Sequence, residues 1–241
     1  MRLAAILAVA AAMLTPAAAH AQAALRVQPL SVEVESPSQA SSITLQNNGN
    51  EVLSLQLRVF AWTQVNGEDR LVPTTDVVAS PPVARIAPGS NYTVRIARTV
   101  GAAAPGTEAS YRLWVDELPP ASLARTEGGT VDVRLRFDLP VFFRGEGAAP
   151  SLGWNAEQVG DEVVLEATNS GSGHARIEGL ALRAGSTEVS FGRGLNGYVL
   201  GNSSRRWTAP AGPADVLAGG DSTVVTGAGG DEPRHTVALA D

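Results

Sequence analysis

The side chains in this sequence that could perform chemistry are few and do not form a catalytic or metal-binding pattern. His174 and His235 lie far apart and in no metal-ligand spacing. Asp116 and Glu117 are neighbours, so on a strand their carboxylates point to opposite faces and make a poor acid–base pair. The chain has no cysteine, which excludes thiol catalysis, disulfides and thiolate metal ligands. We therefore expect no enzyme, no metal site and no cofactor.

Arginine supplies all the permanent positive charge, because all 18 basic residues are Arg and lysine is absent. A guanidinium group binds a carboxylate through two parallel hydrogen bonds, so a carboxylate is the ligand that this composition favours. The formal net charge is −6, which leaves no basic field to attract nucleic acid or an anionic membrane. We expect a protein that does not bind nucleic acid.

The element best suited to position a binding surface is the stretch 131–144, which alternates more strictly than any other part of the chain. Every odd residue from Val131 to Phe143 is apolar, whereas the even residues from Asp132 to Asp138 are charged. Side chains alternate between the two faces of a strand, so the apolar row lies on one face. Such a strand is either a central core strand of its own domain or an edge strand whose apolar row binds another molecule.

Residues 1–23 have the pattern of a cleavable signal peptide. Arg2 provides the positive start, an apolar run follows, and Ala19-His20-Ala21 resembles a small-residue cleavage site. The apolar run is too short to span a bilayer as a helix. We expect an exported protein without stable membrane insertion, and the periplasm of a bacterium as its location.

Short β-type segments separated by turns rich in Asn, Gly and Pro fill the rest of the chain. About seven of them precede residue 145 without helical periodicity, which indicates an immunoglobulin-like sandwich. The small, turn-rich stretch 145–150 is typical of a linker. A second, shorter set of strands follows it. We expect an all-β protein with domains at 24–145 and 146–241.

Several segments taken together resemble the periplasmic pilus-assembly (PapD-like) chaperones, and specifically the branch that serves archaic, spore-coat-U-like pili. They are, in chain order, Phe60-Ala-Trp-Thr-Gln64, Leu71-Val-Pro-Thr-Thr-Asp76, the Ser-Pro-Pro to Pro-Gly block at 80–89, Val94-Arg-Ile-Ala-Arg98, and the Asp-Glu-Leu-Pro block within 111–120. The two blocks at this separation are the specific signal. The resemblance covers about residues 25–145, whereas the second domain matches only in length and β character.

The resemblance implies two immunoglobulin-like β-sandwich domains with an interdomain cleft, and a function in donor-strand complementation. A pilin or coat-type subunit lacks the last strand of its sandwich, and the chaperone supplies one until an outer-membrane usher takes the subunit. The donor residues it implies are Val131, Val133 and Leu135, with Phe137 as a fourth. No nucleotide or other cofactor is implied, because burial of apolar surface provides the free energy.

The sequence departs from the family where basic residues usually bind the terminal carboxylate of the subunit. The two positions fall on Ser31 and Pro140, and neither carries a positive charge. Our candidates for a relocated anchor are, in order, Arg112, on the strand expected beside the donor strand, and then Arg134 and Arg136 on the donor strand itself. Because proline has no N–H, strand addition should also stop or bend at Pro140.

Two further residues have a structural role by resemblance: Glu117 and Arg144 match positions that form an ion pair between the domains.

Two other interpretations of the whole protein remain open. One is a structural two-domain sandwich of a surface layer or fibre, and the other is a secreted carbohydrate-binding or hydrolytic sandwich. The free protein could also cap its own donor strand as a dimer.

Overall fold

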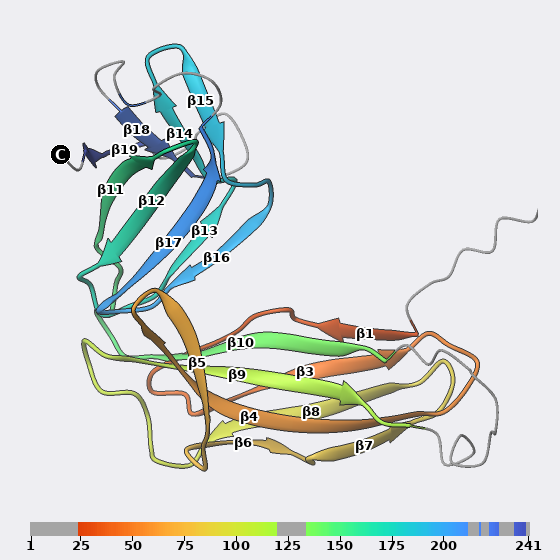
Figure 1. The fold of residues 1–241 in the computed structure, drawn as a ribbon. Coiled ribbons are helices and arrows are strands. Elements are labelled where there is room, and N and C mark those ends of the chain that lie inside the picture. Colours follow the sequence, from red (N-terminus) through yellow and green to blue (C-terminus); the bar gives the residue numbers. More distant parts are fainter. Residues whose placement is uncertain (1–23, 120–133, 212–216, 218–221, 227–233, 240–241) are drawn as a thin grey trace, which may run out of the picture.

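The computed structural model describes residues 24–119, 134–211, 217, 222–226 and 234–239 of the chain. The elements it describes are all β-strands (Figure 1). Within these ranges, no helix is long and apolar enough to cross a membrane. The all-β prediction is confirmed, and the expected signal peptide, residues 1–23, lies outside the described residues.

The first domain is a sandwich of two sheets around one apolar core. One sheet has the spatial order β1 (Leu25–Gln28), β3 (Ala40–Asn47), β8 (Asn91–Arg98) and β6 (Val77–Ser80). The other has the order β2 (Val32–Glu35), β10 (Arg136–Arg144), β9 (Glu108–Glu117), β4 (Leu53–Val65) and β5 (Glu68–Pro73), while β7 (Val83–Ile86) pairs with β4. Ile43 of one sheet and Leu113 of the other are fully buried in the shared core, because alternate residues of each strand point inward.

The chain changes sheets between β1 and β2, and this change determines how β10 is paired. β1 pairs with β3 in one sheet, and β2 pairs in parallel with β10 in the other. Along β10, antiparallel pairing with β9 covers 136–144, whereas pairing with β2 covers only 141–144. Among the described strands, none pairs with the second edge of β10 at 136–140, so that stretch is an open sheet edge.

The second domain contains the remaining described strands, arranged in three small sheets around a separate apolar core. Its strands are β11 (Leu152–Val159), β12 (Glu162–Asn169), β13 (Ala175–Glu178), β14 (Ala181–Ala184), β15 (Thr187–Ser190), β16 (Leu195–Val199), β17 (Ser203–Pro210), β18 (Ser222–Val225), β19 (Arg234–Thr236) and β20 (Ala238–Leu239). The sheet orders are β17-β12-β11-β20, β13-β16 and β15-β14-β18-β19. The prediction of two β-sandwich domains is confirmed.

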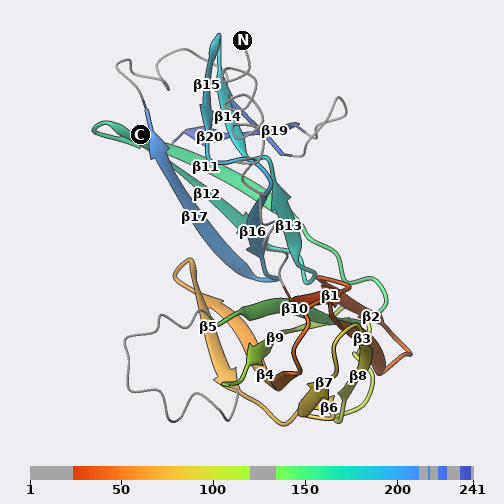
Figure 2. The same ribbon diagram turned by 90° about the vertical axis from the view of Figure 1, so that its right-hand side faces the viewer.

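The two domains meet at one end of the first domain and are set at an angle to each other (Figures 1 and 2). The end of β10 leads into the second domain, and the β4–β5 hairpin reaches the lower ends of β16 and β17. A cavity of about 530 Å³ lies at this junction, lined from the first domain by Trp62 and Glu108 and from the second by Leu200 and Asn202.

The strand expected over 131–144 is observed as β10, Arg136–Arg144, and Val131 and Val133 lie outside the described residues. Strict alternation of burial holds only as far as Leu139, after which Pro140 and Phe142 are buried as well. The reason is that the second domain covers the outer face of the sheet from this point on. Phe142 belongs to an apolar cluster that includes Tyr198 and Leu200 of that domain.

Candidate functional site

The apolar row of β10 changes from buried to exposed along one face. Phe143 has 1% of its surface exposed, and Val141 and Leu139 are also buried in the core of the first domain. Phe137 is only partly buried at the edge of that core, and Leu135, just before the strand, is 37% exposed. The row therefore fills its own core at one end and becomes accessible at the other.

An apolar groove lies beside the accessible end of the row. It has a volume of about 770 Å³ and is lined by Phe137, by β1, and by the segment in which the chain changes sheets, including Leu30. Leu30 is itself largely exposed. The groove adjoins the same stretch of β10 whose second edge is open. An extended peptide could therefore form main-chain hydrogen bonds with the edge and also bury apolar side chains.

The first anchor candidate, Arg112, lies beside the domain junction. The register of β9 and β10 places it directly opposite Pro140. Its guanidinium carbon is 3.7 Å from the centre of the Trp62 ring and 5.8 Å from that of Tyr198, which belongs to the second domain. Burial lowers the pKa of Arg112, although nearby Asp138 and Asp69 oppose the change. Because an arginine stays charged even with a lowered pKa, this position holds a partly desolvated positive charge.

The Tyr198 hydroxyl lies near this guanidinium, and the Ser31 hydroxyl lies near Tyr198. The Ser31 hydroxyl is buried and makes no hydrogen bond of good geometry with the described residues, although it faces Tyr198. Burial raises the pKa of Tyr198, so its hydroxyl stays protonated and can donate a hydrogen bond. An arginine next to a tyrosine hydroxyl has donors that a carboxylate can bind.

The other two anchor candidates lie away from the junction, Arg136 at the start of β10 and Arg134 just before it. Arg136 forms an ion pair with Asp116 and sits 4.1 Å from the centre of the Trp114 ring. Arg58 binds the same carboxylate at 2.7 Å. Burial alone would raise the pKa of Asp116, but these two arginines outweigh it and lower the pKa. Arg134 lines a groove on the same outer face. Arg112, in contrast, lies close to Tyr198 of the second domain.

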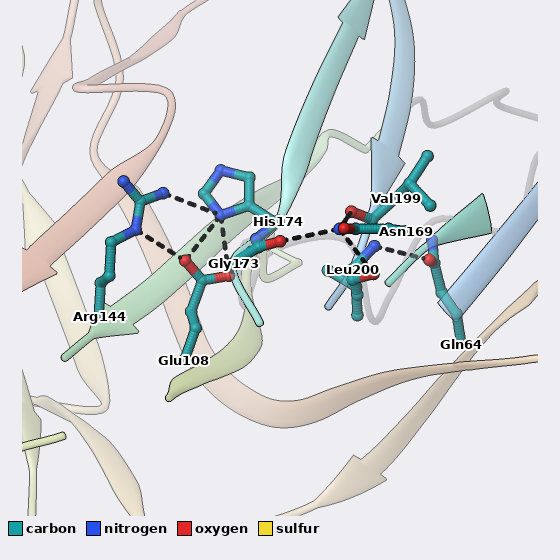
Figure 3. A network of polar contacts seen from close by, with 8 residues as sticks. All are labelled: Gln64, Glu108, Arg144, Asn169, Gly173, His174, Val199 and Leu200. Atoms are coloured by element: carbon teal, nitrogen blue, oxygen red, sulfur yellow. Dashed lines mark hydrogen bonds and ion pairs between the residues drawn. The ribbon is translucent and has the colours of Figure 1, made fainter. Parts of the chain in front are cut away.

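Of Glu117 and Arg144, the two residues expected to take part in an ion pair between the domains, the structure places Arg144 at the junction and Glu117 away from it. Arg144 is at the junction and binds Glu108, with 3.0 Å between Arg144 Nε and Glu108 Oε2 (Figure 3). Glu117 is at the opposite end of β9, where it pairs with Leu55 of β4. In the antiparallel register, Arg144 stands opposite Glu108, and Glu117 lies the length of the strand away.

His174 of the second domain completes this junction. Its Nδ1 is 2.9 Å from Glu108 Oε1, and its backbone N–H donates a 2.8 Å hydrogen bond to the same oxygen. Only 1% of the Glu108 side chain is exposed. Burial alone would raise the pKa of Glu108, but hydrogen bonds and charge from His174, with a hydrogen bond from Arg144, lower it. One buried carboxylate thus binds groups from both domains.

Apolar and amide contacts surround the ion pair. The His174 ring stacks on Phe142 with their centres 3.5 Å apart, and Trp62 packs in the same cluster. The Gln64 side chain donates to Tyr198 O and accepts from Leu200 N, both at 2.9 Å. In the second domain, the Asn169 side chain donates to the carbonyls of Gly173, Val199 and Leu200, which orders the loop that carries His174 (Figure 3).

Reasoning from the sequence did not identify Glu108, Phe142 or His174 as residues of the domain junction. The signal that could have revealed one of them is the pair Phe142-Phe143, because two consecutive large apolar residues at the end of an alternating strand require burial on both faces. Nothing local to Glu108 or His174 indicates their roles. Among the described residues, no group of three or more His, Asp or Glu side chains could hold a metal ion.

Comparison with known proteins agrees with this geometry. Residues 24–149 match the family model for the pili and flagellar-assembly chaperones, PapD N-terminal domain. No curated protein matches the chain. Among solved structures, the chain is similar to one in the CsuC–CsuE chaperone–tip adhesion subunit pre-assembly complex, from the archaic chaperone–usher Csu pili of Acinetobacter baumannii. That match has a TM-score of 0.68 and 26% identity, over 91% of this chain and 100% of that one.

Two more distant structures share the fold. The chaperone DraB of E. coli has a TM-score of 0.58 and 20% identity, over 90% of this chain and 96% of that one. A chain of the complex of the Salmonella enterica pilin SafA with the chaperone SafB has a TM-score of 0.60 and 15% identity, over 88% and 95%. Because the family model spans more than half of the sequence and the two-domain fold agrees, this chain belongs to the PapD-like pilus-assembly chaperones.

Proposed function

We propose that this protein is a periplasmic chaperone that stabilises pilin or coat-type subunits by donor-strand complementation and delivers them to an outer-membrane usher. One observation carries the proposal: the apolar row that fills the core at Phe143 becomes accessible at Phe137 and Leu135, where the second edge of β10 is open. In the similar solved structure, the chaperone CsuC forms a pre-assembly complex with the tip adhesion subunit CsuE.

In this proposal a subunit adds a strand to the edge of β10 at 136–140, and the apolar row enters the groove of its sandwich. The donor residues are Val131, Val133, Leu135 and Phe137. Burial of four such side chains contributes about 6–12 kcal/mol before association costs are subtracted, at roughly 1.5–3 kcal/mol each. Folding of the subunit around the row therefore needs no nucleotide.

We place the carboxylate anchor at Arg112. Its position opposite Pro140 supports this choice, because pairing with β2 begins at Val141 and an added strand must end close to Pro140. Tyr198 of the second domain lies beside it, and its hydroxyl is a further donor. Arg136 is less suited, since its guanidinium already donates a hydrogen bond to Asp116, whereas Asp138 lies beyond hydrogen-bond distance of Arg112.

Periplasmic co-expression with a groove-bearing pilin subunit tests the proposal. We expect Leu135→Asp to abolish co-purification of the subunit, because a charge would enter its apolar groove, while the chaperone stays folded. The matched control is Val159→Asp, which places the same charge at an exposed apolar residue of the second domain. If Leu135→Asp retains the subunit, the donor strand is not used. If Leu135→Asp unfolds the protein, the core-strand interpretation and its structural-sandwich alternative are correct.

A further inference from the structure

Asp138 is a second carboxylate close to the proposed anchor. It lies on the polar face of β10, and its Oδ1 is 3.7 Å from Nη1 of Arg112. The Arg112 side chain is only 15% exposed, whereas that of Asp138 is 45% exposed. The separation is longer than a hydrogen bond, so the N–H groups of Arg112 remain available to another acceptor. Asp138 can also rotate into solvent, because nearly half of its surface is accessible.

The other charged groups near Arg112 are already engaged. Asp69 accepts hydrogen bonds from the Trp62 ring N–H and the Gln64 amide, both at 2.9 Å. It also forms an ion pair with Arg205 at 3.5 Å. Arg205 is itself close enough to Arg112 for its charge to lower the pKa of Arg112. Of the two carboxylates near Arg112, Asp138 is therefore the one that can leave without breaking other contacts among the described residues.

The position of Asp138 also coincides with the path of an added strand. Asp138 belongs to the stretch of β10 with an open edge, two residues before Pro140. A subunit that ends near Pro140 brings its own terminal carboxylate to Arg112, and two carboxylates sharing one guanidinium repel each other.

We infer that Asp138 is a placeholder carboxylate: it neutralises Arg112 in the free protein and is displaced by the terminal carboxylate of the subunit. The inference rests on the proposed function, and it assigns Asp138 a role in specificity and release. Partial neutralisation lowers the energetic cost of a desolvated arginine in the free protein. Repulsion in the complex weakens the anchor, which favours transfer of the subunit to the next binding site.

The test compares the wild-type mature protein with Asp138→Asn. The probe is a short peptide of alternating valine and threonine, made once with a free terminal carboxylate and once with a terminal amide. Binding is followed by the NMR signal of the Arg112 Nε–H, which reports on this guanidinium alone. We expect the acid peptide to bind Asp138→Asn several-fold more tightly than wild type, because the substitution removes a like charge that competes for the same guanidinium. The amide peptide should bind both proteins equally.

Glu188→Gln is the matched control, because it removes an exposed carboxylate from an ion pair with Arg183 in the second domain. It should leave both affinities unchanged. Equal or weaker binding of the acid peptide to Asp138→Asn, or no response of Arg112 in either protein, overturns the inference about Asp138. Failure of the proposed function has a different signature, namely loss of subunit capture by wild type while the acid peptide still prefers Asp138→Asn.

Discussion

The two halves of β10 differ in the pairing of their edges and in how their two faces are covered. At 141–144 the strand is paired on both edges, its apolar row is in the core, and the second domain covers Phe142. At 136–139 one edge is open, Phe137 is only partly buried, and the opposite face bears charged side chains. Under the proposed function, the difference teaches that one half of a single strand can stabilise the fold while the other half binds a subunit. The half at 141–144, which is paired on both edges, holds the half at 136–139 in position.

The largest expected effect on stability is at the covered half. Phe142→Ala should lower the free energy of unfolding by about 3–5 kcal/mol, because it leaves a cavity in the cluster between the domains. Urea unfolding followed by tryptophan fluorescence measures the change. The matched variant Phe137→Ala, in the open half, should cost less than half as much. Equal losses would show that the two halves are not different.

The next effect concerns the buried carboxylate at the junction. Glu108→Gln should lower the free energy of unfolding by about 1–3 kcal/mol at neutral pH, since groups from both domains lose a charged acceptor. The folded-state pKa of Glu108 lies below its usual value of 4.5. Its ionised form therefore stabilises the fold above about pH 4.5, and this contribution is lost as the pH falls through the lowered pKa.

Unfolding curves of both proteins between neutral pH and pH 3 measure this dependence. The difference between wild type and Glu108→Gln should shrink below pH 4.5. The control, Glu166→Gln, removes a carboxylate bound to Arg206 on the surface of the second domain. It should change stability little at any pH. A gap between wild type and Glu108→Gln that widens toward acid would refute the lowered pKa.

The smallest expected effect on the free energy of unfolding is at Leu135, just before the open half of β10. Leu135→Ser should change the free energy of unfolding by no more than about 0.5 kcal/mol, because the side chain contributes little to the core. The same urea titration measures it. A loss as large as that of Phe142→Ala would place Leu135 in the core of its own domain, and the contrast between the two halves of β10 would disappear.

Alternation of side chains was sufficient to predict β10 and the face that holds its apolar row. The position of Arg112 on the neighbouring strand was also predicted, because β9 was expected beside the donor strand. The position of Glu117 differs from the expectation, because it lies at the end of β9 away from the second domain. Both ends of β9 are acidic, and the sequence does not determine which of its ten residues stands opposite Arg144. That choice depends on the register of pairing, which the whole sandwich sets together.

The role of His174 could not be predicted for a related reason. A histidine after a glycine-rich turn has no local feature that identifies its partner, and here the partner is Glu108, 66 residues earlier in the chain. The contact exists because the second domain packs against the ends of β9 and β10. Long-range contacts between separately folded cores leave no periodic signal in either segment.

The start of β2 pairing at Val141 has a consequence for any strand that joins β10 under the proposed function. Such a strand runs along the open edge until it meets β2, and at that boundary Pro140 offers no N–H and Arg112 stands opposite. The point at which an added strand must end therefore coincides with the positive charge of Arg112. Under the proposed function, the first domain would therefore select a subunit by two features, the apolar pattern of the added strand and the distance from that strand to the terminal carboxylate.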